Sequence, residues 1–474
     1  MKKFKTTVAA LAATLALGLA SLATPALAAP QKASDLAPGS IDAGRSVSLT
    51  IHKYADAEGA KGDGKKIEKP TFKKPLSGVK FEVVPVVKDG KAVDLKDPVM
   101  WEAIKSLKPD SLGKFKLDEG KKKEVTTAAD GSVKVDGLSQ SLYLVRESNT
   151  GIHTVAKMVA PFLVTLPFPH KDGWIYDAHV YPKNELSKDP STTKKAVGPK
   201  QMTQEGAKVP FTVISTIPAA QQYNLVKVTD VADKKLTVDK STIQITLNAA
   251  GLPLVLDKDY TVKPDIASVS ITLTAEGLKK LHTDRENKLI ITYEATVKGT
   301  GAIQNDASTF VNNPETKTAV ATTSTNWGDF KLTKTDKASG AALAGAEFKL
   351  YELVNGEPGK EIATYKTDAK GEISDTLFIG TGDVKSKEYV LVENAAPAGY
   401  KLPVGKAAQH RLTLKTNDDD SFTQLAVKVT NDKQETFDLP LTGASGRVIL
   451  ALLGAAFAAI AAGAAFVTVR RRRA

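Results

Sequence analysis

Two distant parts of the chain carry a lysine, a glutamate and an asparagine in the same order. In one part, "LTIHKY" leads through "PLSGVKFEV", "TTAADGSVKV" and "LYLVRE" to "HVYPKNE". In the other, "FKLTKTD" leads through "ALAGAEFKL", "YKTDAKGEIS" and "YVLVE" to "VKVTND". The five segments occur in the same order in both parts, which indicates that the two parts are versions of one structural unit. The equivalent positions are Lys53 and Lys334, Glu147 and Glu393, and Asn184 and Asn431.

These three residue types can form a covalent bond inside an apolar core. Burial lowers the pKa of a lysine and raises that of a glutamate, because both charged forms lose hydration. The neutral amine can attack the asparagine carbonyl while the protonated carboxyl donates to the carboxamide oxygen and shuttles a proton. Ammonia leaves and an isopeptide bond remains, so a fold that holds the reactants replaces an external enzyme. The competing interpretation is that these are ordinary solvated residues on strand faces.

The elements that must position these residues are predicted to be β-strands. Short alternating runs bounded by Gly, Asp, Asn or Pro recur between the two ends, among them "KFEVVPVV", "PFTVIST" and "KLIITYEATV". They favour an all-β chain built of sandwiches. In a sandwich the first and last strands can be neighbours, which would bring Lys334 to Asn431, with Glu393 beside them. One short amphipathic helix is predicted near "DPVMWEAIKSL".

The two ends of the sequence predict an exported precursor. Residues 1–28 combine three early lysines with an Ala/Leu-rich run and an Ala-Leu-Ala pattern, which is typical of a signal peptide cut after Ala28. An N-terminal membrane anchor is the alternative. The 22 residues from Val448 to Val469 carry no charge, and about 33 Å of helix would cross a bilayer. Four arginines follow and stay on the cytoplasmic side, so we expect the body outside the cell.

Composition limits the classes of function that fit. The predicted leader and the segment from Gly443 onward hold eight of the 12 net positive charges, so the body carries a charge of only +4. That mild balance gives no argument for binding nucleic acid. The chain has no cysteine, which excludes disulfides, zinc–thiolate sites, iron–sulfur clusters and a cysteine nucleophile. We expect no cofactor and no metal.

The sequence divides into five expected segments. The mature length favours about three domains, and boundaries are placed where polar residues interrupt the strand pattern. The segments are a signal peptide (1–28), an N-terminal β domain (29–186), a middle β-sandwich (187–325), a C-terminal sandwich (326–436) and a tail with the apolar span (437–474).

The third of the three β blocks resembles a known type of domain. "YVLVENAAPAGY" has the form Y-x-L-x-E-x-x-x-P-x-G-Y of the E-box of Gram-positive pilin subunits. With "LTKTDKASGAALAGAEFKL" it is similar to a CnaB-type domain, which implies an immunoglobulin-like sandwich. In that family the first-strand lysine, here Lys334, bonds the last-strand asparagine, here Asn431. The E-box acid, here Glu393, assists.

A second motif resembles the sorting signal of sortase substrates. "LPLTG" is similar to the LPxTG pentapeptide, and it stands directly before the apolar span and the arginines, as that signal does. The resemblance implies that sortase cuts between the last two residues and keeps the threonine as an acyl-enzyme. The five residues are Leu439, Pro440, Leu441, Thr442 and Gly443.

A third motif contains the lysine that is expected to be joined to that threonine. "WIYDAHVYPKN" resembles the pilin motif W-x-x-x-V-x-V-Y-P-K, with Ala178 where valine is usual. In the family the motif lysine, here Lys183, attacks the sortase-held threonine of the next subunit, here Thr442. Neighbouring strand residues face opposite ways. We therefore expect Lys183 to be exposed and Asn184 to face the core, with Pro182 at a strand edge or end.

The other two β blocks give less defined candidates. The middle block, which starts at "TKKAVGPKQMTQEGAKVPFTV", resembles the second domain of such pilins. In the first block, a Lys53–Asn184 bond assisted by Glu147 rests on the alignment, since no P-x-G-Y follows "LYLVRE"; late formation and no bond are the alternatives. The middle candidates are Lys195 with Lys194 as rival, Asp230 with Glu294 as rival, and Asn305 with Asn312 and Asn313 as rivals.

Taken together, these resemblances imply three tandem immunoglobulin-like, CnaB-type domains and a structural function. The chain is expected to be the shaft subunit of a fimbria, polymerised by sortase from Lys183 to Thr442, anchored to Gram-positive peptidoglycan and supporting adhesion. Its expected partners are identical subunits joined head to tail, pilin-type and housekeeping sortases, and tip or basal pilins; the sequence names no receptor. The alternatives are a monomeric wall-anchored adhesin and an accessory pilin. An enzyme is not expected, because the only chemistry visible is internal and single-turnover.

One acidic cluster stands outside this scheme. "TNDDDSF" places three aspartates together, Asp418 to Asp420. Carboxylates in that number can bind calcium. A tight hairpin turn is the interpretation we prefer, because Asn, Asp and Ser all favour turns.

Overall fold

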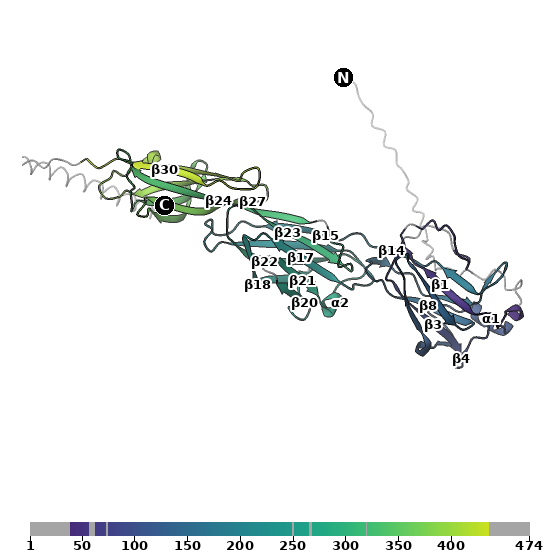
Figure 1. The fold of residues 1–474 in the computed structure, drawn as a ribbon. Coiled ribbons are helices and arrows are strands. Elements are labelled where there is room, and N and C mark those ends of the chain that lie inside the picture. The colour runs from purple at the N-terminus through teal and green to yellow at the C-terminus, as the bar shows by residue number, and fades with distance from the viewer. Residues whose placement is uncertain are drawn as a thin grey trace, which may run out of the picture. The chain divides into compact units, whose positions relative to one another are not determined.

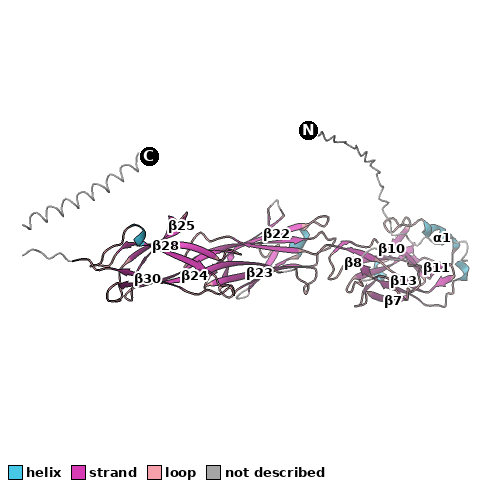
Figure 2. Cartoon of the chain, turned by 90° about the horizontal axis from the view of Figure 1, so that it is seen from above, coloured by secondary structure: helices cyan, strands magenta, loops and turns pink. Residues whose placement is uncertain are grey.

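In a computed structural model of the chain, strands dominate the described residues, and the helices among those residues are few and short (Figure 2). The model describes residues 38–55, 62–72, 74–248, 251–264, 268–318 and 320–435. The prediction of an all-β chain of packed sheets is confirmed. The expected leader, "LPLTG" and apolar span lie outside the described residues. Within the described ranges, no helix combines the length and the apolar character needed to cross a membrane.

The described residues form two compact units. Unit 1 holds the residues up to 200 together with 206–325 and 381–383, and unit 2 holds 201–205, 326–380 and the residues from 384 on. Within unit 1 we call residues 38–186 the N-terminal part and residues 187–325 the middle part. The further division of unit 1 into two domains stays a prediction.

The N-terminal part is a set of small sheets around two hydrophobic cores, one on each face of β3 and β8. Strands β13-β1-β7 form one sheet, β10-β8-β3 with β4, β5 and β6 a second, β2-β14-β9 a third, and β11-β12 a hairpin. Alternation along β1 turns Leu49 and Ile51 inward, where they pack with Phe81 and Val145. The strands are β1 (Val47–His52), β2 (Tyr54–Ala55), β3 (Lys80–Lys88), β4 (Lys91–Ala92), β5 (Phe115–Leu117), β6 (Lys123–Thr126), β7 (Ser132–Leu138), β8 (Ser141–Asn149), β9 (Val155–Lys157), β10 (Phe162–Leu166), β11 (Phe168–His170), β12 (Gly173–Ile175), β13 (Asp177–Val180) and β14 (Lys183–Leu186).

The predicted helix is present in this part. It is α1 (Pro98–Lys105), which begins after Asp97, whose side chain accepts a hydrogen bond from the backbone N–H of Val99. Such a cap satisfies one of the first-turn donors that has no intrahelical partner. Trp101 and Ile104 are buried on the inner face. The remaining helices of the part are the short turns η1 (Pro38–Ser40) and η2 (Glu119–Lys121).

The middle part packs two sheets against each other. One has the order β15-β16-β22-β18-β19, and the other runs β20-β21-β17-β23. The burial pattern of β16 explains why the two sheets pack together. Val209, Phe211 and Val213 are buried while the residues between them are half-buried, as expected for a strand with one face on a core. The elements are β15 (Ser191–Ala196), β16 (Lys208–Ile217), β17 (Val226–Ala232), β18 (Leu236–Leu247), β19 (Leu252–Pro253), β20 (Tyr260–Pro264), β21 (Ser268–Leu273), α2 (Ala275–Lys279), β22 (Asn287–Val297) and β23 (Gly301–Val311).

Unit 2 is a sandwich closed by its first and last strands. One sheet has the order β26-β25-β28-β29, and facing it β24 pairs with β27 and, in parallel, with β30 (Figure 1). Phe330, Phe348, Tyr389 and Leu412 meet in the core between the sheets. The elements are β24 (Ala321–Asp336), β25 (Glu347–Val354), β26 (Glu357–Lys366), β27 (Glu372–Thr381), β28 (Ser386–Ala395), η3 (Gly405–Ala408), β29 (Gln409–Lys415) and β30 (Leu425–Asn431).

Candidate cross-linking sites

The C-terminal site lies between two neighbouring parallel strands of unit 2. In the register of β24 and β30, Asn431 lies opposite Asp336, two positions past Lys334. Both side chains are buried, and Lys334 Nζ donates to Asn431 Oδ1. Glu393 reaches them from β28 in the facing sheet. Its Oε2 lies 3.2 Å from Lys334 Nζ, and its Oε1 accepts a hydrogen bond of 2.6 Å from Asn431 Nδ2.

This arrangement has the chemistry expected of a reactive cluster. Burial lowers the pKa of Lys334, and the charge of Glu393 opposes the shift without cancelling it. A lowered amine pKa enlarges the fraction of neutral nucleophile. One carboxyl group contacts both the nucleophile and the nitrogen that would leave, so it can move a proton between them directly.

The N-terminal site repeats this geometry in unit 1. Lys53 lies between β1 and β2, and Asn184 on β14 faces Ala55 of the parallel strand β2, again two positions past the lysine. Lys53 Nζ donates to Asn184 Oδ1 at 2.5 Å and to Glu147 Oε2 at 2.8 Å. Asn184 Nδ2 donates to Glu147 Oε1 at 2.7 Å. The three residues that only the alignment linked are thus brought together.

The electrostatics of the N-terminal site also favour attack by the amine. Burial lowers the pKa of Lys53 to about 8 even though Glu147 pulls it upward. The backbone N–H of Val159 donates to Asn184 Oδ1 at 2.8 Å. A donor held at that oxygen stabilises the negative charge that develops there when an amine adds to the carbonyl. Sequence motifs gave no signal for Val159, because any residue can supply a backbone N–H.

In the middle site the structure buries the rival lysine and not the preferred one. Lys195, the residue preferred from the sequence, is exposed. Its rival Lys194 is buried, and its Nζ donates to Asp230 Oδ2 at 2.6 Å. The register of β15 on β16 explains this, because Lys194 pairs with the inward-facing Val213 and Lys195 with Thr212 on the other face.

The candidate acid and asparagine of the middle site share the facing sheet. Asp230 on β17 and Asn305 on β23 are buried in neighbouring antiparallel strands. Tyr293, which the sequence analysis did not select, stands between them: its hydroxyl donates to Asp230 Oδ2 at 2.6 Å and accepts from Asn305 Nδ2 at 2.7 Å. Burial lowers the pKa of Lys194 to about 8 and raises the pKa of Asp230.

The rivals for these two positions lie elsewhere. Glu294 is on the opposite face of β22 from Tyr293 and is 3.8 Å from Lys208 Nζ. Asn312 is buried but accepts from the backbone N–H of Asn224, so it fixes a loop. Asn313 bonds Thr316.

The residues of "YPKN" face two ways. Asn184 is buried, as expected, and Pro182 is buried between β13 and β14. Lys183 lies on the opposite face but is half-buried rather than exposed. Its Nζ sits 4.2 Å from the ring centroid of Phe72, and burial lowers its pKa.

The acidic cluster forms a turn. Asp420 has a φ of 63°, and its backbone N–H donates to the carbonyl of Asn417. Lys385 Nζ bonds Asp420 Oδ1 at 2.6 Å, and Ser421 bonds Asp419 Oδ1. These contacts support the turn that we preferred.

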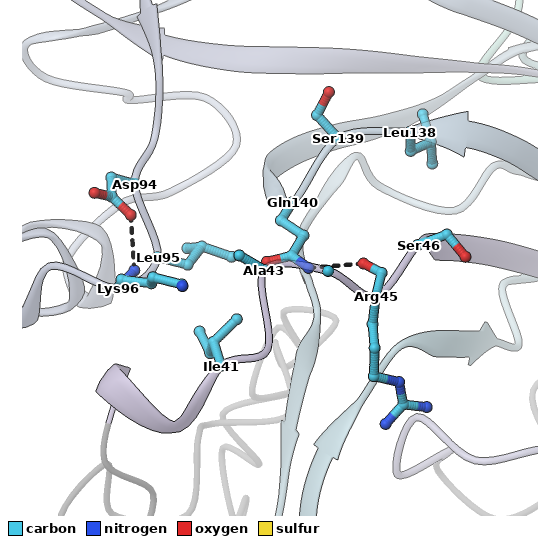
Figure 3. A pocket seen from close by; sticks show the side chains of 11 residues that line it. Ile41, Ala43, Arg45, Ser46, Asp94, Leu95, Lys96, Leu138, Ser139 and Gln140 are labelled. Atoms are coloured by element: carbon cyan, nitrogen blue, oxygen red, sulfur yellow. Dashed lines mark hydrogen bonds between the residues drawn. The ribbon is translucent and has the colours of Figure 1, made fainter.

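A polar cavity of about 620 Å³ opens at a different place in the N-terminal part. It lies between the loops around Ile41, Leu95 and Gln140, and Gln140 Nε2 bonds the carbonyl of Arg45 across it (Figure 3). The predicted site residues do not line it.

Comparisons with known proteins agree with this organisation. Residues 44–185 match the model of the N-terminal D1 domain of Gram-positive pilin subunits. Residues 328–433 match the SpaA model, a prealbumin-like fold domain.

Two relatives match along almost their whole length. The type 2 fimbrial subunit of Actinomyces naeslundii is 30% identical over 545 aligned positions, covering 99% of this chain and 98% of that protein. The type 1 fimbrial subunit of Actinomyces viscosus is 28% identical, with 96% and 97% covered. Among solved structures, the full-length major pilin SpaD of Corynebacterium diphtheriae is 26% identical and covers 84% of this chain and 100% of its own, with a TM-score of 0.45.

Proposed function

This chain belongs to the family of Gram-positive fimbrial subunits; from that premise we propose that it is a structural pilin of the fimbrial shaft, and we propose how its subunits are joined and reinforced. Sortase links Lys183 of one subunit to Thr442 of the next. Three internal bonds, Lys53–Asn184, Lys194–Asn305 and Lys334–Asn431, reinforce the subunit. Glu147, Asp230 and Glu393 assist them.

The observation that carries this proposal is the pairing of three buried lysines with three buried acids. Lys53, Lys194 and Lys334 are each less than a tenth exposed and each lies within 3.2 Å of a carboxylate oxygen. Buried ionisable pairs are costly to desolvate, so three in one chain need a reason. Conversion of each amine and a nearby carboxamide into a neutral amide removes the buried charge.

The fimbria lies on the cell surface, and we propose that it is anchored to peptidoglycan. Pilin-type sortase would build the shaft from identical subunits, and housekeeping sortase would attach it to the wall, with tip or basal pilins at its ends. "LPLTG" and the apolar and basic segments after it support this. The single half-buried lysine of the pilin motif, adjacent to the inward-facing Asn184, supports Lys183 as the linkage point.

Substitution of the linkage lysine tests the assembly. In wall extracts, Lys183→Ala should remove the ladder of covalent multimers and leave monomer. Lys188→Ala, five residues further on and exposed, is the matched control and should keep the ladder. A ladder that persists in Lys183→Ala overturns the linkage and favours a monomeric adhesin.

Mass spectrometry tests the internal bonds. Each bond releases one ammonia, so the intact mass should fall short of the sequence mass by three ammonias, and peptide mapping should locate the three linked pairs. A full sequence mass would contradict all three.

A further inference from the structure

We propose that Tyr293 is a catalytic residue of the middle site, whose hydroxyl relays a proton from Asp230 to the leaving nitrogen of Asn305. This inference rests on the proposed Lys194–Asn305 bond. Three contacts form one continuous path: Lys194 Nζ to Asp230 Oδ2 at 2.6 Å, Asp230 Oδ2 to the Tyr293 hydroxyl at 2.6 Å, and that hydroxyl to Asn305 Nδ2 at 2.7 Å.

The acid of the middle site does not bridge its partners as the glutamates do. Glu147 and Glu393 each use one oxygen for the lysine and the other for the asparagine nitrogen. In the middle site Asp230 Oδ2 serves both Lys194 and Tyr293, and the buried Asp230 Oδ1 has no hydrogen-bond partner. Asn305 Nδ2 bonds the tyrosine hydroxyl instead. An aspartate is one methylene shorter, and the hydroxyl occupies the gap.

Tyr293 is held in a state that can both give and take a proton. Its ring stacks on Phe211, the residue opposite it on β16, with centroids 5.4 Å apart. Burial raises its pKa, and the charge of Asp230 raises it further, so the hydroxyl stays protonated. A neutral hydroxyl has one donor and two acceptor positions, which is what a relay requires.

The proton balance closes with these groups alone. Lys194 first gives a proton to Asp230, and its neutral Nζ bonds to Cγ of Asn305. Asp230 passes its proton to the tyrosine oxygen as Tyr293 gives its own proton to Nδ2. The Cγ–Nδ2 bond breaks and ammonia leaves, while Asp230 takes the second proton from Nζ. The products are one amide, one ammonia, an intact tyrosine and a protonated Asp230, which match the reactants in atoms and charge.

The unpartnered carbonyl of Asn305 fits this scheme. Asn305 Oδ1 is buried without a hydrogen-bond partner, whereas Asn184 Oδ1 receives both the lysine and the Val159 N–H. A carbonyl without donors gains no stabilisation of the developing charge. Transfer of a proton to the leaving nitrogen therefore matters more at this site than at the other two.

Tyr293→Phe tests the relay, because it keeps the stacked ring and removes only the hydroxyl. The full-length chain is made by cell-free synthesis, samples are taken over time, and peptide mapping follows each of the three linked pairs. We expect the Lys194–Asn305 bond to form about 10²–10⁴ times more slowly, with the other two bonds unchanged as internal controls. Tyr223→Phe is the matched variant, because it removes another part-buried hydroxyl of the middle part, one that bonds backbone carbonyls.

The outcomes separate the relay from the bond it serves. If the wild-type chain lacks the Lys194–Asn305 link, the proposed function fails at this site and the relay with it. If the link forms in Tyr293→Phe at the wild-type rate, the bond stands and the relay is overturned. If Tyr293→Phe misfolds, a second experiment tests the relay without a substitution: the wild-type chain is synthesised in deuterium oxide. There the middle bond should slow more than the C-terminal bond, and an equal effect overturns the relay.

Discussion

The C-terminal and middle sites place the same three kinds of residue on different strands. In the C-terminal site, lysine and asparagine come from neighbouring parallel strands, β24 and β30, and the glutamate reaches across from the facing sheet. In the middle site, acid and asparagine are the neighbours, on β17 and β23, and the lysine reaches across from β15. In both sites the acid faces the lysine from the other sheet, but in the middle site a tyrosine from the lysine's own sheet completes the contact to the asparagine.

In our proposal the strand order of each sandwich sets how the three reacting groups meet, and the length of the acid side chain is matched to that order. The N-terminal site follows the C-terminal one in strand order, in the two-position offset of the asparagine and in the use of glutamate. All three sites bury a lysine amine beside an acid. In each site the burial lowers the pKa of the lysine.

Loss of the C-terminal bond should have the largest effect. Asn431→Ala leaves the Lys334–Glu393 pair in place but removes the electrophile. The bond spans 97 residues, and by analogy with a disulfide closing such a loop its loss should lower the free energy of unfolding by about 4–5 kcal/mol. Calorimetry of the full chain measures this, with the exposed Asn394→Ala as control. An unchanged transition would show that the C-terminal cross-link does not reinforce unit 2.

Shortening the acid of the C-terminal site should sharpen the comparison. Glu393→Asp keeps the carboxyl group but withdraws it by one methylene, and among the described contacts of this cluster there is no tyrosine hydroxyl between acid and asparagine. Misplacement of this size should slow bond formation about 10²-fold. Time-resolved peptide mapping measures the rate, and Glu388→Asp on the same strand is the control. An unaltered rate would mean that acid length is not matched to topology.

The pH dependence of stability should expose the buried amine of the N-terminal site. Burial lowers the pKa of Lys53 in the folded chain to about 8, against 10.5 when unfolded, and Asn184→Ala should keep this amine free and buried. Between these values the unfolded state binds more protons, so stability should rise from pH 8 to pH 10.5. In the wild-type chain the proposed bond turns the amine into an amide, so this contribution should be absent. Denaturant titrations of both proteins give the difference, and parallel curves would argue against a free buried amine in the variant.

The sequence carried the strand pattern and much of the chemistry, but not the registers. Alternation was enough to place Asn184 inward and Lys183 on the other face, because adjacent residues of one strand must diverge. The choice between Lys194 and Lys195 depended on how β15 pairs with β16 across a long connection, which local patterns do not determine. The sequence did not single out Tyr293, because an aromatic residue in an alternating strand is normally a packing residue of the core.

The smallest expected effect distinguishes those two lysines. Lys195→Ala removes an exposed side chain on the outer face of β15, so the Lys194–Asn305 bond should form at the wild-type rate, with stability changed by no more than about 0.5 kcal/mol. Lys194→Ala on the inner face should abolish the bond. Peptide mapping of both variants decides, and loss of the bond in Lys195→Ala alone would restore the lysine first favoured by the sequence. That result would also break the comparison, because an outward lysine cannot share a buried acid with Tyr293.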